Sequence, residues 1–227
     1  MSSGLARVGE QVAEGLGLAW PEHVAIVGAG GKTTVLLGLW HHLHQLGRPV
    51  LATTTTKVAV AEVAGLVFLS SRPEGHKLVG IPPATADEVF RSGAYDAVLV
   101  EADGARHQLV KAPGPHEPVI PHTATFVVAV IGAGALDRVI EDVAFRPLRV
   151  AAAAGCSPYD RLSPALAARL LTSDLGARRG VPPGARFGVV IARVSPDNRA
   201  AAESLAALLH GTGVTAVLLP AVDAGDR

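Results

Sequence analysis

Residues 23–34 read His-Val-Ala-Ile-Val-Gly-Ala-Gly-Gly-Lys-Thr-Thr, and this stretch decides the fold. Its first half, His23 to Val27, is a short and continuous apolar run, which is typical of a strand buried on both faces. A glycine-rich turn follows, and from Thr33 to Leu46 the apolar residues have helical spacing. This order predicts a phosphate-binding loop, because backbone N–H groups of the turn and of the helix start can hold phosphate oxygens.

The residues of this loop match the chemistry of nucleotide binding. Lys32 would place its ammonium group against the terminal phosphates, and the hydroxyl of Thr33 would take one ligand position of Mg²⁺. The spacing departs from the GxxxxGK[ST] motif, whose first glycine would fall where the chain has Ile26. The alternative is a glycine turn that only packs the helix against the strand. We predict that a nucleoside triphosphate is bound, with Mg²⁺, by Gly28, Ala29, Gly30, Gly31, Lys32, Thr33 and Thr34.

Other apolar runs and helical patterns alternate along the rest of the chain. Further buried strands are predicted at Val50 to Ala52, Ala97 to Val100, Phe126 to Ile131, Phe187 to Ile191 and Ala216 to Leu219. Helices are predicted at Ala86 to Ser92, Pro164 to Leu171 and Asp197 to His210, with Ser163 and Ser195 as N-caps. This alternation predicts an α/β fold, a mostly parallel sheet flanked by helices in a three-layer, P-loop NTPase-like sandwich.

The length of the chain sets the expected domain organisation. We expect one nucleotide-binding domain over residues 1–227, because domains of this class commonly reach such a length undivided. Residues 1–22 would form an N-terminal helical extension, with a helix from Leu5 to Leu16. The proline-rich stretches Ala105 to Pro121 and Gly176 to Arg186 are predicted to be loops. The first loop would emerge at the carboxyl ends of the strands, where open parallel sheets bind ligands.

Charge balance and composition argue against several kinds of partner. Lys and Arg number 20 and Asp and Glu number 20, so no overall field would attract nucleic acid or an anionic membrane. The longest apolar run, Phe126 to Leu136, is interrupted by glycines and is too short to span a bilayer. The single cysteine, Cys156, cannot form an internal disulfide, and residues 1–20 lack an unbroken apolar signal core. We expect a cytoplasmic protein with no nucleic-acid and no membrane partner.

A run of hydroxyl side chains follows the second predicted strand. Residues 53–57 read Thr-Thr-Thr-Thr-Lys, at the edge of the sheet where the first strand would deliver its phosphates. Thr54, Thr56 and Lys57 are candidates for contacts with the nucleotide, or for a switch that senses its phosphates. The alternative is a strand extension, since threonine favours strands and successive residues point to opposite faces.

Two carboxylates, Glu101 and Asp103, follow the third predicted strand. They would lie on the same side if the strand continued, in a place where a hard cation beside phosphates needs oxygen ligands. We expect Glu101 to be a Mg²⁺ ligand and both carboxylates, with Lys32, to be catalytic residues. One carboxylate would hold the metal, and the other would orient an attacking water or a substrate group. The alternative is that both are solvated residues at the start of a loop.

Charged side chains in the first proline-rich loop could be presented over the same site. Arg106, Lys111, His116 and Glu117 could all face it, and the last three are candidates for contacts with the bound nucleotide. Exposed loop charges are often only solvated, which is the alternative for each. Pro118 argues against the helix that a zinc site of the H-E-x-x-H type would need.

Four motifs occur in order: G-A-G-G-K-T-T from Gly28, T-T-T-T-K from Thr53, V-E-A-D-G-A from Val100 and K-A-P-G-P-H-E-P-V-I-P from Lys111. Together they resemble the YqeC family, the accessory proteins of selenium-dependent molybdenum hydroxylases, from about Val24 to Arg149. The resemblance implies a P-loop fold. It also implies a role in maturing such a molybdenum hydroxylase or its pterin cofactor, which would be the partners.

The expected nucleotide depends on the late strand Phe187 to Ile191. GTPases of related build carry N-K-x-D after such a strand, and its aspartate binds guanine, whereas Ala192-Arg193-Val194-Ser195 follows here. The missing asparagine and carboxylate favour ATP over GTP. Three functions stay open: a nucleotide-hydrolysing or nucleotide-gated accessory factor, an ATP-dependent transferase or ligase, and a binding module that uses nucleotide only to order its loops.

Overall fold

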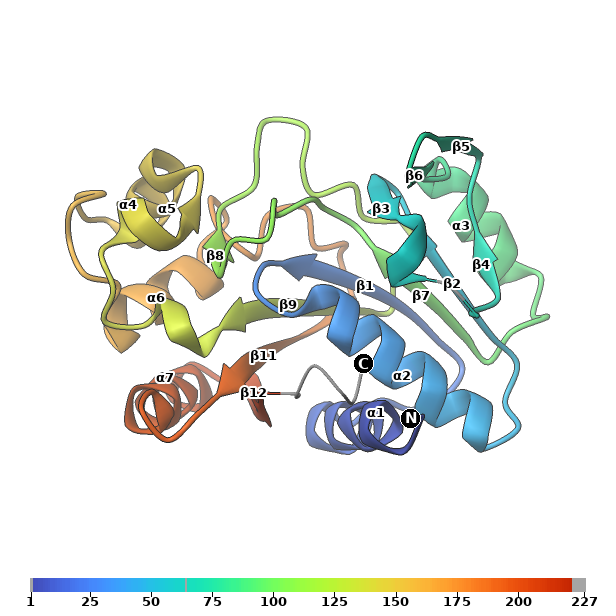
Figure 1. Cartoon of the computed structure of the whole chain (residues 1–227), viewed down its shortest axis with the longest axis horizontal. Coiled ribbons are helices and arrows are strands. Elements are labelled where there is room, and N and C mark those ends of the chain that lie inside the picture. Colours follow the sequence, from blue (N-terminus) through green and yellow to red (C-terminus); the bar gives the residue numbers. More distant parts are fainter. Residues whose placement is uncertain (1, 64, 222–227) are drawn as a thin grey trace.

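The computed structural model describes residues 2–63 and 65–221 and is built around a seven-stranded sheet (Figure 1). The strand order is β12-β11-β9-β1-β7-β2-β4, and every neighbouring pair is parallel. The strands are β1 (Glu22–Gly28), β2 (Val50–Thr54), β4 (Phe68–Leu69), β7 (Ala97–Glu101), β9 (Phe126–Gly132), β11 (Arg186–Val194) and β12 (Thr215–Pro220). All six strands predicted from apolar runs are present, and the short edge strand β4 is additional.

Helices cover both faces of this sheet, because alternate residues of each strand point to opposite sides. They are α1 (Ser2–Leu16), α2 (Lys32–Gln45), α3 (Pro83–Arg91), α4 (Ile140–Val143), α5 (Pro147–Ala154), α6 (Pro164–Thr172) and α7 (Arg199–Gly211). The core that holds α1 and α2 contains Val24 and Ile26. The opposite core, with α4 to α7, contains Ala25 and Val27, and α3 packs on Val98 of the same face. The predicted three-layer α/β sandwich is confirmed.

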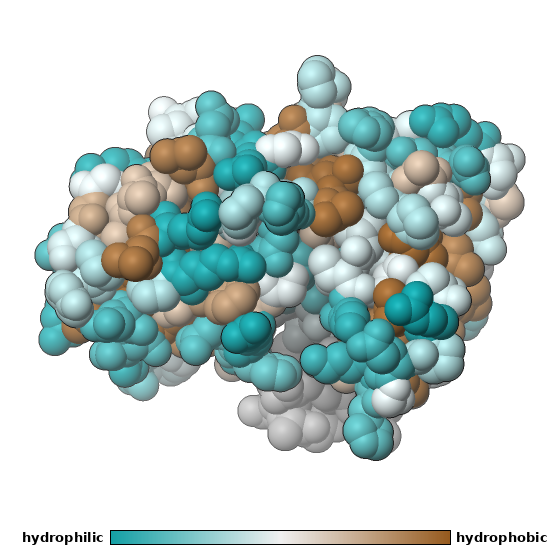
Figure 2. All heavy atoms as spheres, turned by 90° about the horizontal axis from the view of Figure 1, so that it is seen from above, coloured by the Kyte–Doolittle hydropathy of each residue, from teal (hydrophilic) through white to brown (hydrophobic). Residues whose placement is uncertain are grey.

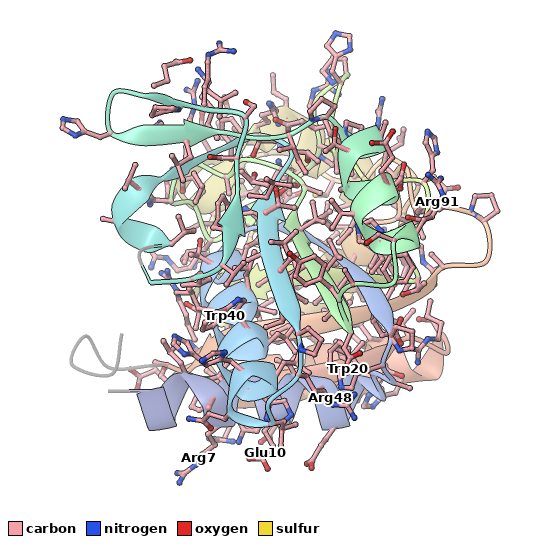
Figure 3. All side chains as sticks on the ribbon, turned by 90° about the vertical axis from the view of Figure 1, so that its right-hand side faces the viewer. Arg7, Glu10, Trp20, Trp40, Arg48 and Arg91 are labelled. Carbon is pink, nitrogen blue, oxygen red and sulfur yellow. The ribbon has the colours of Figure 1, made fainter. Side chains whose placement is uncertain are left out.

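The N-terminal helix packs against the helix that follows the glycine-rich loop. Val8 and Val12 of α1 are buried in one core with Leu39 of α2. Arg7 and Glu10, on the outer side of α1, point away from α2 into solvent (Figure 3). The helix predicted within the N-terminal extension is therefore present, and its apolar side supports α2.

Two small sheets lie outside the main one and are not marked by the apolar pattern. Strands β3 (Lys57–Ala59), β6 (Lys77–Val79) and β5 (Arg72–Glu74) pair antiparallel in the order β3-β6-β5, and β8 (Val110–Lys111) pairs parallel with β10 (Ala144–Phe145). The segment from Ala105 to Pro121 is thus not loop throughout. These strands are only two or three residues long and most include charged residues, so the sequence has no apolar run that would predict them. Figure 1 shows the three-stranded sheet and α3 at one end of the molecule and α4 to α6 at the other.

The two predicted N-caps have different outcomes. Ser163 caps α6 as predicted, since its Oγ accepts the N–H of Leu166 at 3.3 Å. The prediction for Ser195 is wrong, because α7 begins at Arg199. Ser195 instead belongs to a turn, in which its own N–H donates to Oδ1 of Asn198 at 2.9 Å.

The surface seen in Figure 2 is mixed in character. On this face, hydrophobic residues form small separate patches between hydrophilic ones. Large exposed apolar side chains come from separate parts of the chain, for example Leu46, Leu148 and Leu175. Within residues 2–63 and 65–221, no helix has the length and apolar character needed to cross a membrane.

Candidate functional site

The loop between β1 and α2 curls closely over the end of β9. Gly28 (φ 97°) and Gly30 (φ 82°) have positive φ angles, which glycine adopts far more readily than other residues. A Cβ on Gly28 would lie 2.2 Å from the carbonyl oxygen of Val130, and one on Gly30 would lie 2.6 Å from the nitrogen of Gly132. Both glycines are therefore required by the backbone angle and by the lack of space.

The start of α2 presents backbone N–H groups toward the space in front of the loop. The first backbone hydrogen bond of the helix runs from the N–H of Val35 to the carbonyl of Gly31, at 3.0 Å. The N–H groups of Lys32, Thr33 and Thr34 precede it and have no backbone acceptor among the described residues. Free N–H groups at a helix N-terminus, together with the helix dipole, favour a bound anion such as phosphate.

Lys32 is buried and points back over the loop. Its Nζ donates to the carbonyl oxygen of Gly28 at 2.9 Å and lies 3.3 Å from Oδ1 of Asp103 and 3.6 Å from Oε1 of Glu101. The hydroxyl of Thr33 donates to Oε2 of Glu101 at 3.3 Å. These groups meet because β7 is the direct neighbour of β1 in the sheet. The structure thus brings together the lysine, the threonine and both carboxylates that the sequence singles out.

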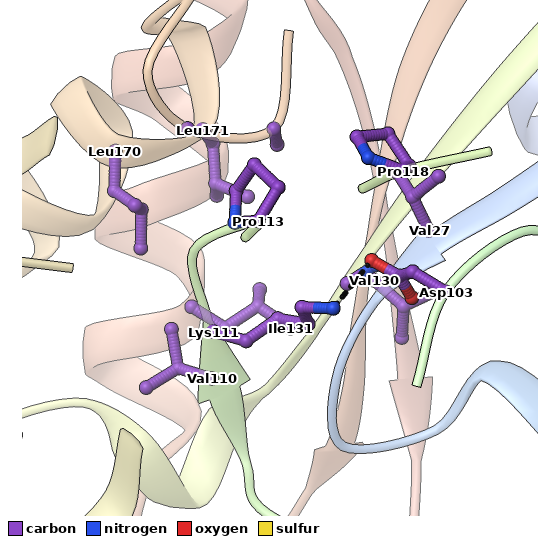
Figure 4. Close-up of a pocket in the computed structure, with 13 residues that line it drawn as sticks. Val27, Asp103, Val110, Lys111, Pro113, Pro118, Val130, Ile131, Leu170 and Leu171 are labelled. Carbon is purple, nitrogen blue, oxygen red and sulfur yellow. Dashed lines mark hydrogen bonds and ion pairs between the residues drawn. The ribbon is translucent and has the colours of Figure 1, made fainter. Parts of the chain in front are cut away.

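Asp103 lies beneath the loop and supports its shape. Its Oδ2 accepts the N–H of Gly28 at 3.1 Å and lies 3.0 Å from Nζ of Lys111. Lys111 is buried, and its Nζ also donates to the carbonyl of Gly104 at 2.7 Å and to Glu117 at 2.8 Å. Figure 4 shows the Asp103–Lys111 pair beside a mainly apolar cavity of about 20 Å³. A cavity of this size has room for about one water molecule.

The ion pairs continue outward from Lys111 through Glu117 to Arg146. Arg146 donates to both carboxylate oxygens of Glu117, at 2.6 and 3.3 Å. Burial opposes ionisation of Glu117, but the hydrogen bonds from Arg146 and Lys111 outweigh it and lower its pKa from 4.5 to about 2. The ring of Phe145 lies among three cations, with its centroid 4.3 Å from Arg146, 5.2 Å from Arg106 and 5.8 Å from Lys111.

A cleft of about 610 Å³ opens in front of the loop. Many of the residues predicted for the site line it: Gly30, Gly31, Lys32, Thr33, Thr34, Thr56, Lys57, Glu101 and Glu117. We call the part of the lining that comes from strands β3 and β6 and from residues 104–108 the opposite wall. The cleft therefore joins the glycine-rich loop to a part of the fold that the apolar pattern does not mark.

Other predicted residues lie near the cleft without lining it. Gly28 and Asp103 border the small cavity beneath the loop, and Ala29 is buried with its N–H bonded to Val130. Thr54 is buried, and its Oγ1 donates to the carbonyl of Glu101 at 2.8 Å, so it holds the end of β7. Two residues of the proline-rich loop are also outside the lining: Lys111 is beneath the loop, and His116 is exposed.

Sequence reasoning missed Lys77, His107 and Arg193 and named Arg106 only as a loop charge that could face the site, and all four line the cleft. Arg106 (φ 48°) and His107 (φ 62°) are the central residues of a turn closed by the Gln108 N–H and the Ala105 carbonyl, at 3.0 Å. Two positive φ angles define a type I′ turn, which favours Asn-Gly. Each non-glycine residue there costs about 1–2 kcal/mol, and such strain concentrates at functional sites.

Arg193 lies between the cleft and a second cavity of about 340 Å³. The register of β11 against β12 shifts between Ile191 and Val194, and Arg193 adopts a φ of 60° at this irregularity. The second cavity is at the carboxyl ends of β11 and β12 and shares Gly31, Thr34 and Arg193 with the cleft. Its volume is in the range of small-molecule sites. The position of Arg193, two residues beyond the predicted late strand Phe187 to Ile191, was the available signal in the sequence.

Comparisons with known proteins bear on the identity of the chain. The sequence profile described as YqeC protein matches residues 24–148, a span that contains the glycine-rich loop, Glu101 and Glu117. The uncharacterized protein YqeC of Escherichia coli (strain K12) is 31% identical over 206 residues, covering 81% of this chain and 80% of that protein. The chain belongs to the YqeC family.

Solved structures show the fold of this YqeC-family chain. It is similar to a chain of the MinC:MinD cell division protein complex of Aquifex aeolicus, with a TM-score of 0.50 and 14% identity over 88% of this chain and 81% of that one. It is also similar to chloroplast FtsY of Physcomitrella patens, with a TM-score of 0.50 and 14% identity over 98% of this chain and 68% of that one. At this identity both likenesses show the fold alone, which is P-loop NTPase-like.

The donor set of the YqeC-family loop fits a Mg²⁺–nucleotide complex. Across residues 2–63 and 65–221, no group of three or more His, Cys, Asp or Glu side chains could hold a metal ion. Mg²⁺ in nucleotide sites needs only one or two protein ligands, because substrate phosphates and waters supply the rest. Thr33 and Glu101 offer a hydroxyl and a carboxylate oxygen 3.3 Å apart, beside the free N–H groups of α2.

Proposed function

We propose that this chain binds a nucleoside triphosphate with Mg²⁺ and acts as a nucleotide-hydrolysing or nucleotide-gated accessory factor. The observation that carries the proposal is the meeting of free N–H groups, Lys32 and the Thr33–Glu101 pair at one loop. The N–H groups would hold phosphate oxygens, the ammonium group would offset their charge, and the two oxygens would hold the cation. A turn that only packs a helix needs none of these groups.

Lys32 would exchange partners when a phosphate enters. Its ammonium group is shared among the Gly28 carbonyl, Asp103 and Glu101. Phosphate oxygens at the start of α2 would compete for it with strong, charge-assisted hydrogen bonds. Asp103 would keep the N–H of Gly28 and the ammonium of Lys111, so the loop could hold its shape during the exchange. Mg²⁺ bound at Thr33 and Glu101 would reduce the negative charge on the phosphates.

ATP is the proposed nucleotide, and the residues at the carboxyl ends of β11 and β12 support this choice. The second cavity, which adjoins the loop, has room for a nucleoside and is lined by Ala192, Arg193 and Pro220. None of them carries a carboxylate that could accept the two hydrogen bonds of a guanine edge. GTP is therefore the less favoured nucleotide.

The YqeC family supports a place in the maturation of a selenium-dependent molybdenum hydroxylase or its pterin cofactor. The nucleotide would gate such a step through residues 53–57. Thr54 Oγ1 binds the Glu101 carbonyl and accepts the N–H of Thr56 at 3.0 Å, just before β3 of the small sheet. A shift of Glu101 would therefore reach the opposite wall of the cleft, where a partner could sense it.

Calorimetric titration with ATP and GTP, with and without Mg²⁺, tests the proposal. We expect Mg²⁺-dependent binding of ATP that Lys32→Ala weakens by about 10- to 100-fold, because a lost hydrogen bond to a charged group costs about 1.5–3 kcal/mol. Thr33→Ala should mainly reduce the dependence on Mg²⁺. The matched control is Arg7→Ala, which removes one positive charge from the outer side of α1. Unchanged affinity in a folded Lys32→Ala variant would show that the loop is not the site.

The size of the cleft favours a second candidate, the ATP-dependent transferase or ligase. The second cavity of about 340 Å³ has room for a nucleoside, so the cleft of about 610 Å³ would hold the phosphates and a further ligand. Phosphate release that depends on an added cofactor substrate would distinguish this candidate. Nucleotide that binds and is never turned over would indicate a non-catalytic binding module.

A further inference from the structure

The cations that line the cleft differ in whether a carboxylate lies close enough to form an ion pair with them. Lys32 is paired with the carboxylates beside the loop, and Lys57 forms an ion pair with Glu74 of the small sheet. Lys77 and Arg106 line the same cleft on its opposite wall. Within the part of the chain that the structure describes, neither has a carboxylate oxygen within 4.0 Å. Lys77 interacts electrostatically with Glu74, its cross-strand neighbour, but forms no close ion pair with it. The side-chain N–H donors of Lys77 and Arg106 are therefore available to an anion in the cleft.

Both side chains are held on defined backbone features. Lys77 begins β6, the central strand of the small sheet, and faces Ala59 of β3 and Glu74 of β5 in the pairing register. Arg106 occupies the first central position of the strained turn, and its guanidinium lies 5.2 Å from the centroid of the Phe145 ring. An aromatic ring next to a guanidinium restrains it and leaves its N–H donors available.

These two cations are separated from the expected nucleoside position. The second cavity meets the loop at Gly31, Thr34 and Arg193, which gives the nucleoside room on that side. Lys77 and Arg106 line only the larger cleft. The phosphates already have the N–H groups of α2 and Lys32 as partners. A nucleotide that fills the loop and the second cavity would therefore leave Lys77 and Arg106 without an anion.

We propose that Lys77 and Arg106 hold an anionic second substrate in the cleft, beyond the terminal phosphate of the nucleotide. This substrate is a small organic molecule with a phosphate or carboxylate group. Arg and Lys are the side chains suited to such groups, because they form charge-assisted hydrogen bonds to their oxygens. His107, next to Arg106 and also in the lining, supplies a further ring N–H or acceptor. The placement beside the terminal phosphate rests on the proposed nucleotide site.

The test uses protein saturated with Mg²⁺ and a non-hydrolysable ATP analogue. Inorganic phosphate, pyrophosphate and succinate are titrated separately by calorimetry, so that the phosphate and carboxylate classes are distinguished. We expect one class to bind, and its affinity to fall about tenfold or more in the double variant Lys77→Ala, Arg106→Ala. Affinity for the ATP analogue should stay within about twofold, because these side chains would not contact it. Arg72→Ala, which removes an exposed cation of β5 outside the cleft lining, should change neither.

The possible results distinguish failure of this inference from failure of the proposed function. Loss of analogue binding in the double variant, as strong as in Lys32→Ala, would assign both cations to the nucleotide and overturn the inference. Failure of all three probes to bind the saturated protein would overturn it as well. If the wild-type chain binds no analogue, the proposed function fails, and the probes are titrated without nucleotide. A site lost in the double variant and kept in Lys32→Ala would then support the inference, and the reverse pattern would reject it.

Discussion

The two walls of the cleft are built differently. The loop wall, residues 28–34, packs against β9 and rests on the buried Asp103–Lys111 pair. The opposite wall consists of strands of three residues and a strained turn, with exposed Lys77 and Arg106. Phosphate binding needs a fixed backbone, whereas recognition of a second ligand needs a few side chains that can change without disturbing the core. The comparison predicts that mutations in the two walls have opposite consequences.

The largest effect on stability is expected from Gly30→Ala in the loop wall. The added Cβ would meet backbone atoms of Gly132 and Leu109 at a positive φ angle, so we expect a loss of about 4 kcal/mol in the free energy of unfolding. Nucleotide binding should be lost with it. The matched control is Gly104→Ala on the opposite wall, where a Cβ has no atom within 4 Å. Urea denaturation should place the control within about 0.5 kcal/mol of wild type, and equal stability of the two variants would refute the close packing of the loop.

A smaller effect is expected when the pH is lowered, because His23 lies in β1, the strand that precedes the loop wall. Burial lowers the pKa of His23 from 6.5 to about 4; Asp87 opposes this shift, and Arg91 adds to it. Between these values the unfolded chain binds a proton that the folded chain does not. The free energy of unfolding should therefore fall as the pH drops from 6.5 to 4, by up to about 3 kcal/mol. Urea denaturation at several pH values should show a weaker slope in His23→Gln, and an equal slope in both proteins would contradict the assignment.

The smallest effect on stability is expected from a double substitution in the turn of the opposite wall. Replacing the turn residues by Arg106→Asn and His107→Gly should raise the free energy of unfolding by about 1–2 kcal/mol, because Asn-Gly suits a type I′ turn. The same variant should bind the phosphate or succinate probe more weakly. Arg106→Ala alone should weaken probe binding without the gain in stability. If the Asn-Gly variant were more stable and bound the probe as wild type does, the strained residues would have no part in recognition.

The loop wall could be predicted from the sequence because its signals are local. Glycine, lysine and threonine follow one another between a strand and a helix, and the structure has that order. Glu101 could also be predicted to lie nearby, since parallel strands end at a common edge and β7 adjoins β1. The burial of Thr54 and Lys111 could not be predicted from the motifs. Thr54 ends an internal strand, and the pairing of β8 with β10 holds Lys111 beneath the loop.

The opposite wall could not be predicted because it depends on pairing between separate short segments. Residues 57–59, 72–74 and 77–79 pair antiparallel, and none of them contains an apolar run that fixes a register. The position of Lys77 follows only from this pairing. Arg106 was visible as a loop charge, but its positive φ angle and its contact with Phe145 depend on residues distant in the sequence.

The chain of ion pairs beneath the loop has a consequence for the form in which a nucleotide can enter. Lys32, Lys111 and Arg146 are linked to Glu101, Asp103 and Glu117, so the formal charges of the cluster cancel. A bare polyanion would add uncompensated negative charge beside two carboxylates, which is costly at a buried site. A polyanion that carries a divalent cation brings part of its own compensation. The charge balance beside the loop would thus favour the metal complex over the bare polyanion, before any contact with base or sugar.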